Sequence, residues 1–270
     1  MSFAAAVLLG AIQGLTEFLP VSSSAHLILA RAFFGWEMPP DVGLAFDVAL
    51  HIGTLVAIVV FFRVEIWKMV IVLPALFSTT DDVSVRMARM IAIGTIPVVI
   101  VGLAFNDVIE HVLRTPAVAA AALAFGAVLM IVAERLGSRT RAEDSMTWRD
   151  AVLIGCAQAA ALIPGMSRSG STITVGMFLG MRREAAARFT FLLAIPATLA
   201  AAAKESLEVS RMALPAGSAV LFATGTLVSA VVGYLTIKYF LRFLATNRLD
   251  VFAAYRVALA TATVVWLLRH

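Results

Sequence analysis

The chain has 270 residues, of which 61% are hydrophobic and 14% are charged, and its formal net charge is +4. Soluble domains carry about 25% charged residues, so a water-soluble fold of this composition would expose far too much apolar surface. The composition therefore predicts an all-α polytopic membrane protein. The single cysteine, Cys156, excludes an intramolecular disulfide and a CxxC metal site. The small net charge gives no reason to expect a nucleic-acid partner.

Apolar segments of two lengths follow one another along the chain. A helix needs roughly 20 apolar residues to cross a bilayer, whereas segments of about 10–14 residues are more often re-entrant or interfacial. The expected spans are Gly43–Phe62, Met90–Phe105, Pro116–Ala133, Phe189–Ala203, Ala213–Ile237 and Val251–Leu268. The short arms form two pairs, and a proline lies between the two arms of each pair. They are Met1–Phe18 with Ala25–Phe34, and Ala151–Ile163 with Gly170–Met181. We therefore expect six transmembrane helices plus two re-entrant helical hairpins, with the short segment Ile66–Phe77 at the membrane interface.

The distribution of basic residues predicts the orientation. If each hairpin enters and leaves on one side, the loops of one side hold 14 Lys and Arg residues, and the loops of the other side, with both termini, hold five. The positive-inside rule places the first side in the cytoplasm. Both termini and the mouth of the first hairpin are then periplasmic, and the second hairpin enters from the cytoplasm. This assignment depends on Ile66–Phe77 not spanning the membrane.

An internal repeat supports the same architecture. Leu19-Pro20 followed by serines matches Ile163-Pro164 followed by serines, with Gln13 and Gln158 upstream at similar distances. FDVALHIGTLVA from Phe46 aligns with FTFLLAIPATLA from Phe189, and Gly94 aligns with Gly225. We expect one integral-membrane domain over residues 1–270, with one half at about 1–133, a cytoplasmic linker at 134–150 and a second half at about 151–270. Each half has one hairpin and three crossings, so the second half is inverted relative to the first. Such inverted repeats typically form a binding site near the midplane.

The first break, QGLTEFLPVSSSAHLILA from Gln13 to Ala30, gathers polar residues in an otherwise aliphatic region. Polar groups at membrane depth are functional by default. Ser23 and His26 are three residues apart, close enough for the histidine to accept a serine proton if the arm is helical. Glu17 could orient His26 or hold a divalent cation through its carboxylate oxygens.

The second break, LIPGMSRSGST from Leu162 to Thr172, has the complementary chemistry. Gly165 permits a tight turn, and Ser167 or Ser169 can cap the helix that starts near Gly170. The N–H groups at such a helix start attract anions, and Arg168 adds a planar fork suited to phosphate. One break supplies a nucleophile and a base, the other a phosphate cradle, so together they predict hydrolysis of a phosphate ester or pyrophosphate.

The segments QGLTEFLPVSSSAH and PGMSRSGST resemble the two signature motifs of the bacterial undecaprenyl-pyrophosphate phosphatases of the bacitracin-resistance type. The resemblance extends over the whole chain, including FDVALHIGT, FTFLLAIP and the late AAYR at 253–256. It implies an enzyme of the bacterial inner membrane that removes one phosphate from undecaprenyl diphosphate and so recycles the carrier lipid of cell-wall synthesis. The family resemblance, and not the spacing of residues, also implies dependence on Mg²⁺ or Ca²⁺.

The family's catalytic residues fall on Glu17, Ser23, His26 and Arg168. The residues expected to bind the diphosphate are Gln13, Ser22, Ser24, Gly165, Ser167, Ser169, Gly170 and Thr172. Many members carry a second glutamate where this chain has Gln13, which leaves Glu17 as the expected single metal ligand. The expected partners are the prenyl diphosphate lipid and the bilayer, and a homodimer is left open.

Other interpretations of these residues remain at this point. The serines at 22–24 could simply cap a helix, and Arg168 could form a structural ion pair with Glu17. Asp47 and His51 could share a structural hydrogen bond, or they could orient the residues that touch the substrate without touching it themselves. Arg256 is expected to pair with a carboxylate, to cap a helix end or to touch lipid phosphate. His26 could itself be the nucleophile, and a lipid flippase or anion-coupled transporter could use the same inverted-repeat pocket.

Overall fold

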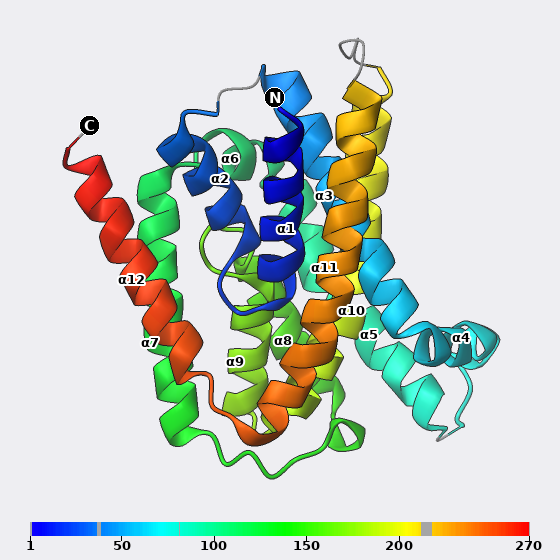
Figure 1. Ribbon diagram of the computed structural model, residues 1–270. Coiled ribbons are helices and arrows are strands. Elements are labelled where there is room, and N and C mark those ends of the chain that lie inside the picture. Colours follow the sequence, from blue (N-terminus) through cyan, green and yellow to red (C-terminus); the bar gives the residue numbers. More distant parts are fainter. Residues whose placement is uncertain (1, 37–38, 81, 212–217, 270) are drawn as a thin grey trace.

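The computed structural model describes residues 2–36, 39–80, 82–211 and 218–269 (Figure 1). Within these ranges the secondary structure is helical, with no β-strand. The helices are α1 (Phe3–Phe18), α2 (Ser23–Phe34), α3 (Pro40–Phe61), α4 (Arg63–Ile71), α5 (Val83–Ala104), α6 (Asn106–His111), α7 (Pro116–Leu136), α8 (Trp148–Ala160), α9 (Arg168–Phe178), α10 (Arg183–Val209), α11 (Ser218–Thr246) and α12 (Asp250–Leu267). Two short 3₁₀ turns, η1 (Leu73–Ala75) and η2 (Glu143–Ser145), complete the described elements.

Six helices are long and apolar enough to cross a membrane, namely α3, α5, α7, α10, α11 and α12. This confirms the predicted number of spans among the described residues. Several helices run beyond their apolar cores, and α5 begins at Val83 rather than at the expected Met90. Hydropathy falls at charged residues, but helical hydrogen bonding continues through them. Arg89 donates to the carbonyl oxygens of Ala75 and Leu76, at the short 3₁₀ turn before α5. Between the expected spans that end at Phe105 and begin at Pro116, the chain is not only a loop, because Asn106 starts the short helix α6.

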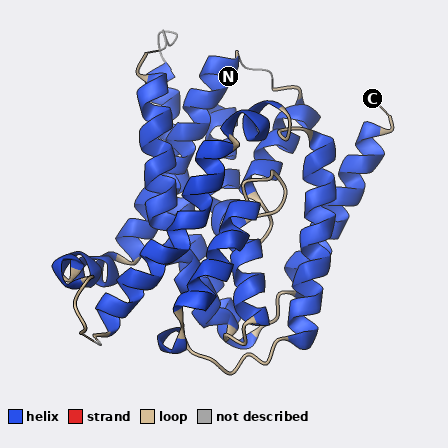
Figure 2. Ribbon diagram, turned by 180° about the vertical axis from the view of Figure 1, so that it is seen from behind, coloured by secondary structure: helices blue, strands red, loops and turns tan. Residues whose placement is uncertain are grey.

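The two short helix pairs are α1 with α2 and α8 with α9. Their connecting turns lie at mid-height in the bundle rather than at either end of it (Figures 1 and 2). Helix α1 ends two residues before Pro20, and α8 ends at Ala160, ahead of Pro164. Proline lacks the N–H group that a continuing helix would need, so each break has a local cause. The arrangement is compatible with the predicted re-entrant hairpins.

The ends of the helices separate into the two predicted groups. The N-terminus, the C-terminus and α6 lie at the upper end of the bundle in Figure 1. Helix α4, the α7–α8 connection and the α11–α12 connection lie at the lower end. The loops assigned to the arginine-rich side therefore share one end of the molecule, whereas both termini lie at the other.

Close helix contacts recur in the two halves. Helix α1 packs against α11, and α8 packs against α5. A Cβ atom at Gly10 would lie 2.8 Å from the Gly225 carbonyl oxygen, and one at Gly155 would lie 2.3 Å from the Gly94 carbonyl oxygen. Small residues let backbones approach in this way inside membranes. Gly94 and Gly225 are aligned in the predicted repeat, and each lies against the first hairpin helix of the other half. This reciprocal packing is compatible with an inverted repeat.

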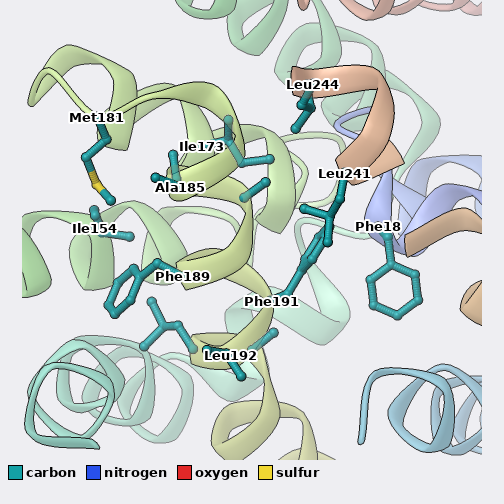
Figure 3. Packing of buried hydrophobic residues seen from close by; sticks show 14 of the residues in the cluster. Phe18, Ile154, Ile173, Met181, Ala185, Phe189, Phe191, Leu192, Leu241 and Leu244 are labelled. Carbon is teal, nitrogen blue, oxygen red and sulfur yellow. The ribbon is translucent and has the colours of Figure 1, made fainter. Parts of the chain in front are cut away.

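The main buried cluster fills the lower half of the bundle and reaches the base of α1. Figure 3 shows Phe18 near Phe191 and Leu241, with Phe189 and Leu192 beside Phe191 on α10. The Phe18 and Phe191 rings meet edge to face, with their centroids 5.5 Å apart. This packing fixes the end of α1, and with it the position of Glu17 one residue before Phe18.

Candidate active site

The turns that join the two short helix pairs share an unusual conformation. Ser22 and Ser167 have φ angles of 74° and 69°, which non-glycine residues rarely adopt. Each serine caps the following helix, because its hydroxyl accepts the N–H group three residues later. In each turn the same hydroxyl also lies 3.2 Å from the hydroxyl two residues on, that of Ser24 or Ser169. The two breaks are therefore matched in backbone and in side chain.

Glu17, at the end of α1, is the centre of the site. Its Oε1 atom accepts a hydrogen bond from Arg168 Nη2. Its Oε2 atom accepts from Ser23 Oγ at 2.6 Å and from Gln13 Nε2 at 2.8 Å, and His51 Nε2 lies 3.9 Å from it. The carboxylate is buried, and an isolated buried charge would be strongly unfavourable without such partners.

Ser23 and Arg168 are far apart in the sequence but touch the same carboxylate. This confirms the expectation that the two breaks meet at one place. It also shows that Arg168 forms an ion pair with Glu17 in this state. Arg168 Nη1 donates in addition to Thr198 Oγ1 on α10, so the guanidinium is held from two sides.

The histidine does not have the expected contact with the serine. His26 Nδ1 lies 2.7 Å from the Ser22 carbonyl oxygen, which can only accept, so this nitrogen carries the proton. His26 Nε2 lies 2.7 Å from the Tyr255 hydroxyl, and the two rings are stacked. The Ser23 hydroxyl donates to Glu17 instead, so the expected Ser23–His26 proton transfer is wrong for this geometry. Three-residue spacing allowed that contact, but both ring nitrogens of His26 are engaged elsewhere, by the Ser22 carbonyl oxygen and by the Tyr255 hydroxyl.

The residues around Glu17 fit a divalent cation that is shared with a phosphate. Gln13 Oε1 is buried and has no hydrogen-bond partner among the described residues. It lies in the same side chain that donates to Glu17, so a carboxylate and an unpaired amide oxygen are adjacent. Magnesium is commonly held by one or two carboxylates together with substrate phosphates and water. No group of three or more His, Cys, Asp or Glu residues that could hold a metal ion is found in the described part of the chain.

The other predicted phosphate-binding residues mostly shape the turns. Ser169 Oγ donates to the Leu19 carbonyl oxygen at 2.9 Å and so joins the second turn to the first. Thr172 donates to the Arg168 carbonyl oxygen and accepts from Thr190. Gly170 faces the Arg256 guanidinium, where a Cβ atom would lie 2.7 Å from Nη1.

Gly165 is required by the second turn in two ways. Its φ angle is +99°, a conformation that favours glycine. A Cβ atom there would lie 2.4 Å from the Ala119 carbonyl oxygen on α7. Gly165 therefore allows the turn to lie against α7, and this close packing explains why a larger residue does not fit.

Arg256 on α12 is the main residue whose place the sequence did not predict. It is fully buried, and its contacts are with carbonyl groups rather than with a carboxylate. The carbonyl oxygens that accept from it are those of Pro20, Ala122, Leu123, Gly165 and Met166, at 3.0–3.3 Å. Because Pro20 belongs to the first turn and Gly165 to the second, one guanidinium ties both turns to α7. The sequence signals were a charged residue inside an apolar stretch and the AAYR segment of the family resemblance, and neither indicated these acceptors.

Two further residues at the site had weaker signals. Thr198 is one of two threonines in an apolar span, a common residue type in membrane helices, and nothing in its spacing points to Arg168. His51 was noticed with Asp47, but their side chains do not pair with each other. Instead His51 Nδ1 lies 2.8 Å from the Asp47 backbone carbonyl oxygen, and its Nε2 faces Glu17.

Known proteins resemble this chain along most of its length. A relative from Rubrobacter xylanophilus named undecaprenyl-diphosphatase is 47% identical over 266 residues, which cover 97% of each chain. Proteins of the same name from Thermomicrobium roseum and Marinobacter nauticus are 42% and 44% identical, over 94% of this chain and 94% and 95% of theirs. The family model described as bacitracin resistance protein BacA matches residues 6–262. With Glu17, Ser23 and Arg168 gathered from the two matched turns, the chain belongs to the bacitracin resistance protein BacA family.

Proposed function

We propose that this protein is an undecaprenyl-diphosphate phosphatase, which releases the terminal phosphate and leaves undecaprenyl phosphate. The observation that carries the proposal is the Glu17 carboxylate, which holds a serine hydroxyl on one oxygen and an arginine on the other. This arrangement brings a nucleophile, a base and a phosphate-binding group together. The relatives' names support hydrolysis rather than transport by a flippase.

Arg168 binds the terminal phosphate. Its planar guanidinium can donate two parallel hydrogen bonds to phosphate oxygens. The first N–H groups of α9 face the same turn and add to the attraction for an anion. When the phosphate takes over Arg168 Nη2, Glu17 loses its strongest donor and becomes a better proton acceptor.

Ser23 then attacks the terminal phosphorus. Glu17 Oε2, already 2.6 Å from Ser23 Oγ, takes the hydroxyl proton as the new O–P bond forms. The bond from the terminal phosphorus to the bridging oxygen breaks, and undecaprenyl phosphate leaves with the bonding electrons. Water then attacks the phosphoserine, which releases inorganic phosphate and restores the serine. Arg168 stabilises the charge on the phosphoryl oxygens in both steps.

His26 and Gln13 support this chemistry. His26 holds the first turn through Ser22 and is itself held by Tyr255. A divalent cation would be held by Glu17 and Gln13 Oε1, and it would neutralise charge on the diphosphate. Mg²⁺ or Ca²⁺ fits the oxygen donors present.

The same proposal includes the orientation in the inner membrane. The arginine-rich end is cytoplasmic, the first hairpin and both termini face the periplasm, and residues 134–150 link halves 1–133 and 151–270. We propose no nucleic-acid partner. If the protein forms a homodimer, each chain would still contain a whole site, because Glu17, Ser23 and Arg168 all come from one chain. Ser138→Cys and Arg269→Cys, each made without Cys156, test the orientation by labelling of intact cells with an impermeant thiol reagent. Labelling at residue 269 but not at 138 is expected, and the reverse pattern would overturn the orientation.

The activity is tested with purified protein in detergent and a long-chain prenyl diphosphate. A micelle has no second compartment, so release of inorganic phosphate measures hydrolysis and not transport. Wild-type protein is expected to release phosphate, with faster release when Mg²⁺ or Ca²⁺ is present than with a chelator. Substrate binding without phosphate release under all of these conditions would refute the proposed activity.

A further inference from the structure

Two arginines share one carboxylate at the end of the bundle where the termini lie. Arg31, in the last turn of α2, donates from Nη1 to Asp47 Oδ2 at 3.0 Å and from Nη2 to Asp47 Oδ1. Arg114, just before α7, donates from Nη2 to Asp47 Oδ2 at 3.5 Å. Asp47 itself is buried. These three groups carry a net charge of +1, since two guanidinium groups face one carboxylate.

The cluster has more hydrogen-bond donors than its own acceptors satisfy. Arg31 Nε is buried and has no partner among the residues that the structure describes. Within that part of the chain Arg114 makes one long hydrogen bond, to Asp47, and 40% of its side chain is exposed. Each guanidinium offers five N–H donors, and a buried donor without a partner destabilises the folded state. One arginine would be enough for a structural ion pair, so the surplus favours an oxygen-rich anion.

The cluster is connected to the candidate active site through α3. His51 lies one turn after Asp47, and its Nδ1 donates to the Asp47 backbone carbonyl oxygen at 2.8 Å. Its Nε2 faces Glu17 Oε2 at 3.9 Å. His51 therefore lies between the arginine cluster at Asp47 and the Glu17 carboxylate in space.

Helix α2 gives the spacing of the cluster from the nucleophile. Arg31 is eight residues beyond Ser23, which corresponds to about 12 Å along a helix. At this distance Arg31 does not touch a phosphorus atom that reacts at Ser23, but an anion could pass between Arg31 and the site around Ser23. In Figure 1 the cluster end of α2 is on the side of both chain termini, where the first helix pair opens.

We propose that Arg31 and Arg114 form an outer phosphate-binding station, through which the anion reaches or leaves Arg168. The ligand is a phosphate group, bound by guanidinium forks while Asp47 holds the forks in place. It is either the terminal phosphate of the lipid on entry or inorganic phosphate on exit. This inference rests on the proposed phosphatase function.

The test compares Arg114→Gln with wild type and with Arg269→Gln, which removes one charge at the same end but outside the cluster. The measurements are kcat/KM for a long-chain prenyl diphosphate and Ki for inorganic phosphate, in detergent at low and high salt. Arg114→Gln is expected to raise KM or Ki about tenfold, and high salt should reduce the difference. Arg269→Gln should stay within twofold of wild type.

The outcomes separate the two sources of phosphate. A rise in KM alone identifies the lipid headgroup as the ligand, and a rise in Ki alone identifies free phosphate. Arg114→Lys, which keeps the charge but not the fork, is measured beside it, with thermal unfolding of both variants. If neither variant changes KM or Ki by more than twofold, the station is refuted. If wild-type protein releases no phosphate, the proposed function fails instead, so the two failures are distinct.

Discussion

Ser23 and Arg168 bind opposite oxygens of the Glu17 carboxylate, although 145 residues separate them in the chain. Their position in the two matched turns is also the same, because each follows the serine with a positive φ angle. The nucleophile and the phosphate-binding arginine are thus corresponding residues of the two helix pairs. The asymmetry that makes a catalytic site comes from Glu17, which only the first pair provides.

Ser23→Ala should reduce phosphate release at least 100-fold, because it removes the hydroxyl that attacks phosphorus. Ser24→Ala is the matched control, since Ser24 lies in the same turn and bonds only to Ser22 in the described contacts. It should lose less than tenfold. Trapping of labelled phosphate on residue 23 of the wild type would identify the intermediate. Near-normal turnover by folded Ser23→Ala protein would exclude the serine as nucleophile.

His26→Asn should retain at least ten times the activity of His26→Ala. An asparagine amide can replace Nδ1 as the donor to the Ser22 carbonyl oxygen and so preserve the turn, whereas alanine leaves that acceptor unpaired. If His26 were the base or the nucleophile, both variants would be equally inactive, and this equality would contradict the positioning role. Steady-state phosphate release from folded variants gives the comparison.

Arg256→Met should destabilise the protein by at least about 3 kcal/mol, because charged groups contribute roughly 1.5–3 kcal/mol per buried hydrogen bond. Five carbonyl groups would lose their donor. Thermal unfolding in detergent measures the loss. Hydrogen exchange should increase in both turns at once, since one side chain holds both. Faster exchange in only one of them would contradict the clamp.

Gly155→Ala should lower stability by about 1–3 kcal/mol, as expected for overpacking. The added Cβ would lie 2.3 Å from the Gly94 carbonyl oxygen, so α8 and α5 would have to separate. Gly102→Ala, on α5, is the control, because its Cβ would meet the nearest atom, Leu162 Cδ1, only at 3.8 Å. Thermal unfolding should rank wild type and Gly102→Ala together, well above Gly155→Ala.

Asp150, at the start of α8, should make stability depend on pH. Burial by itself raises the pKa of this carboxyl group, but hydrogen bonds from Arg141 and Thr147 outweigh it and lower the pKa below the ordinary value. A lowered pKa in the folded state adds stability above the ordinary pKa, and that stability is lost as pH falls through the folded-state pKa. The melting temperature of wild type should therefore fall more steeply than that of Asp150→Asn below about pH 4. Parallel curves would contradict this assignment.

The sequence by itself determined the class of the protein, the number of spans and the two breaks. Long apolar segments, prolines and serine clusters are local features, and local features report helix length and helix interruption. The motifs also selected Glu17, Ser23 and Arg168 as candidate site residues, and the structure brings these three into contact. The sequence aligned Gly94 with Gly225, but only the structure shows that each lies against a helix of the other half.

The tertiary structure decided which groups touch. Spacing along one helix suggested that Ser23 would pair with His26, but the packing of α1 and α12 against α2 places Glu17 at the hydroxyl and Tyr255 at the imidazole. Arg256 could not be placed from the sequence, because its five acceptors are backbone carbonyl groups, which every residue carries. Hydrogen bonds between distant segments depend on how the helices pack, and no local pattern of residues records that packing.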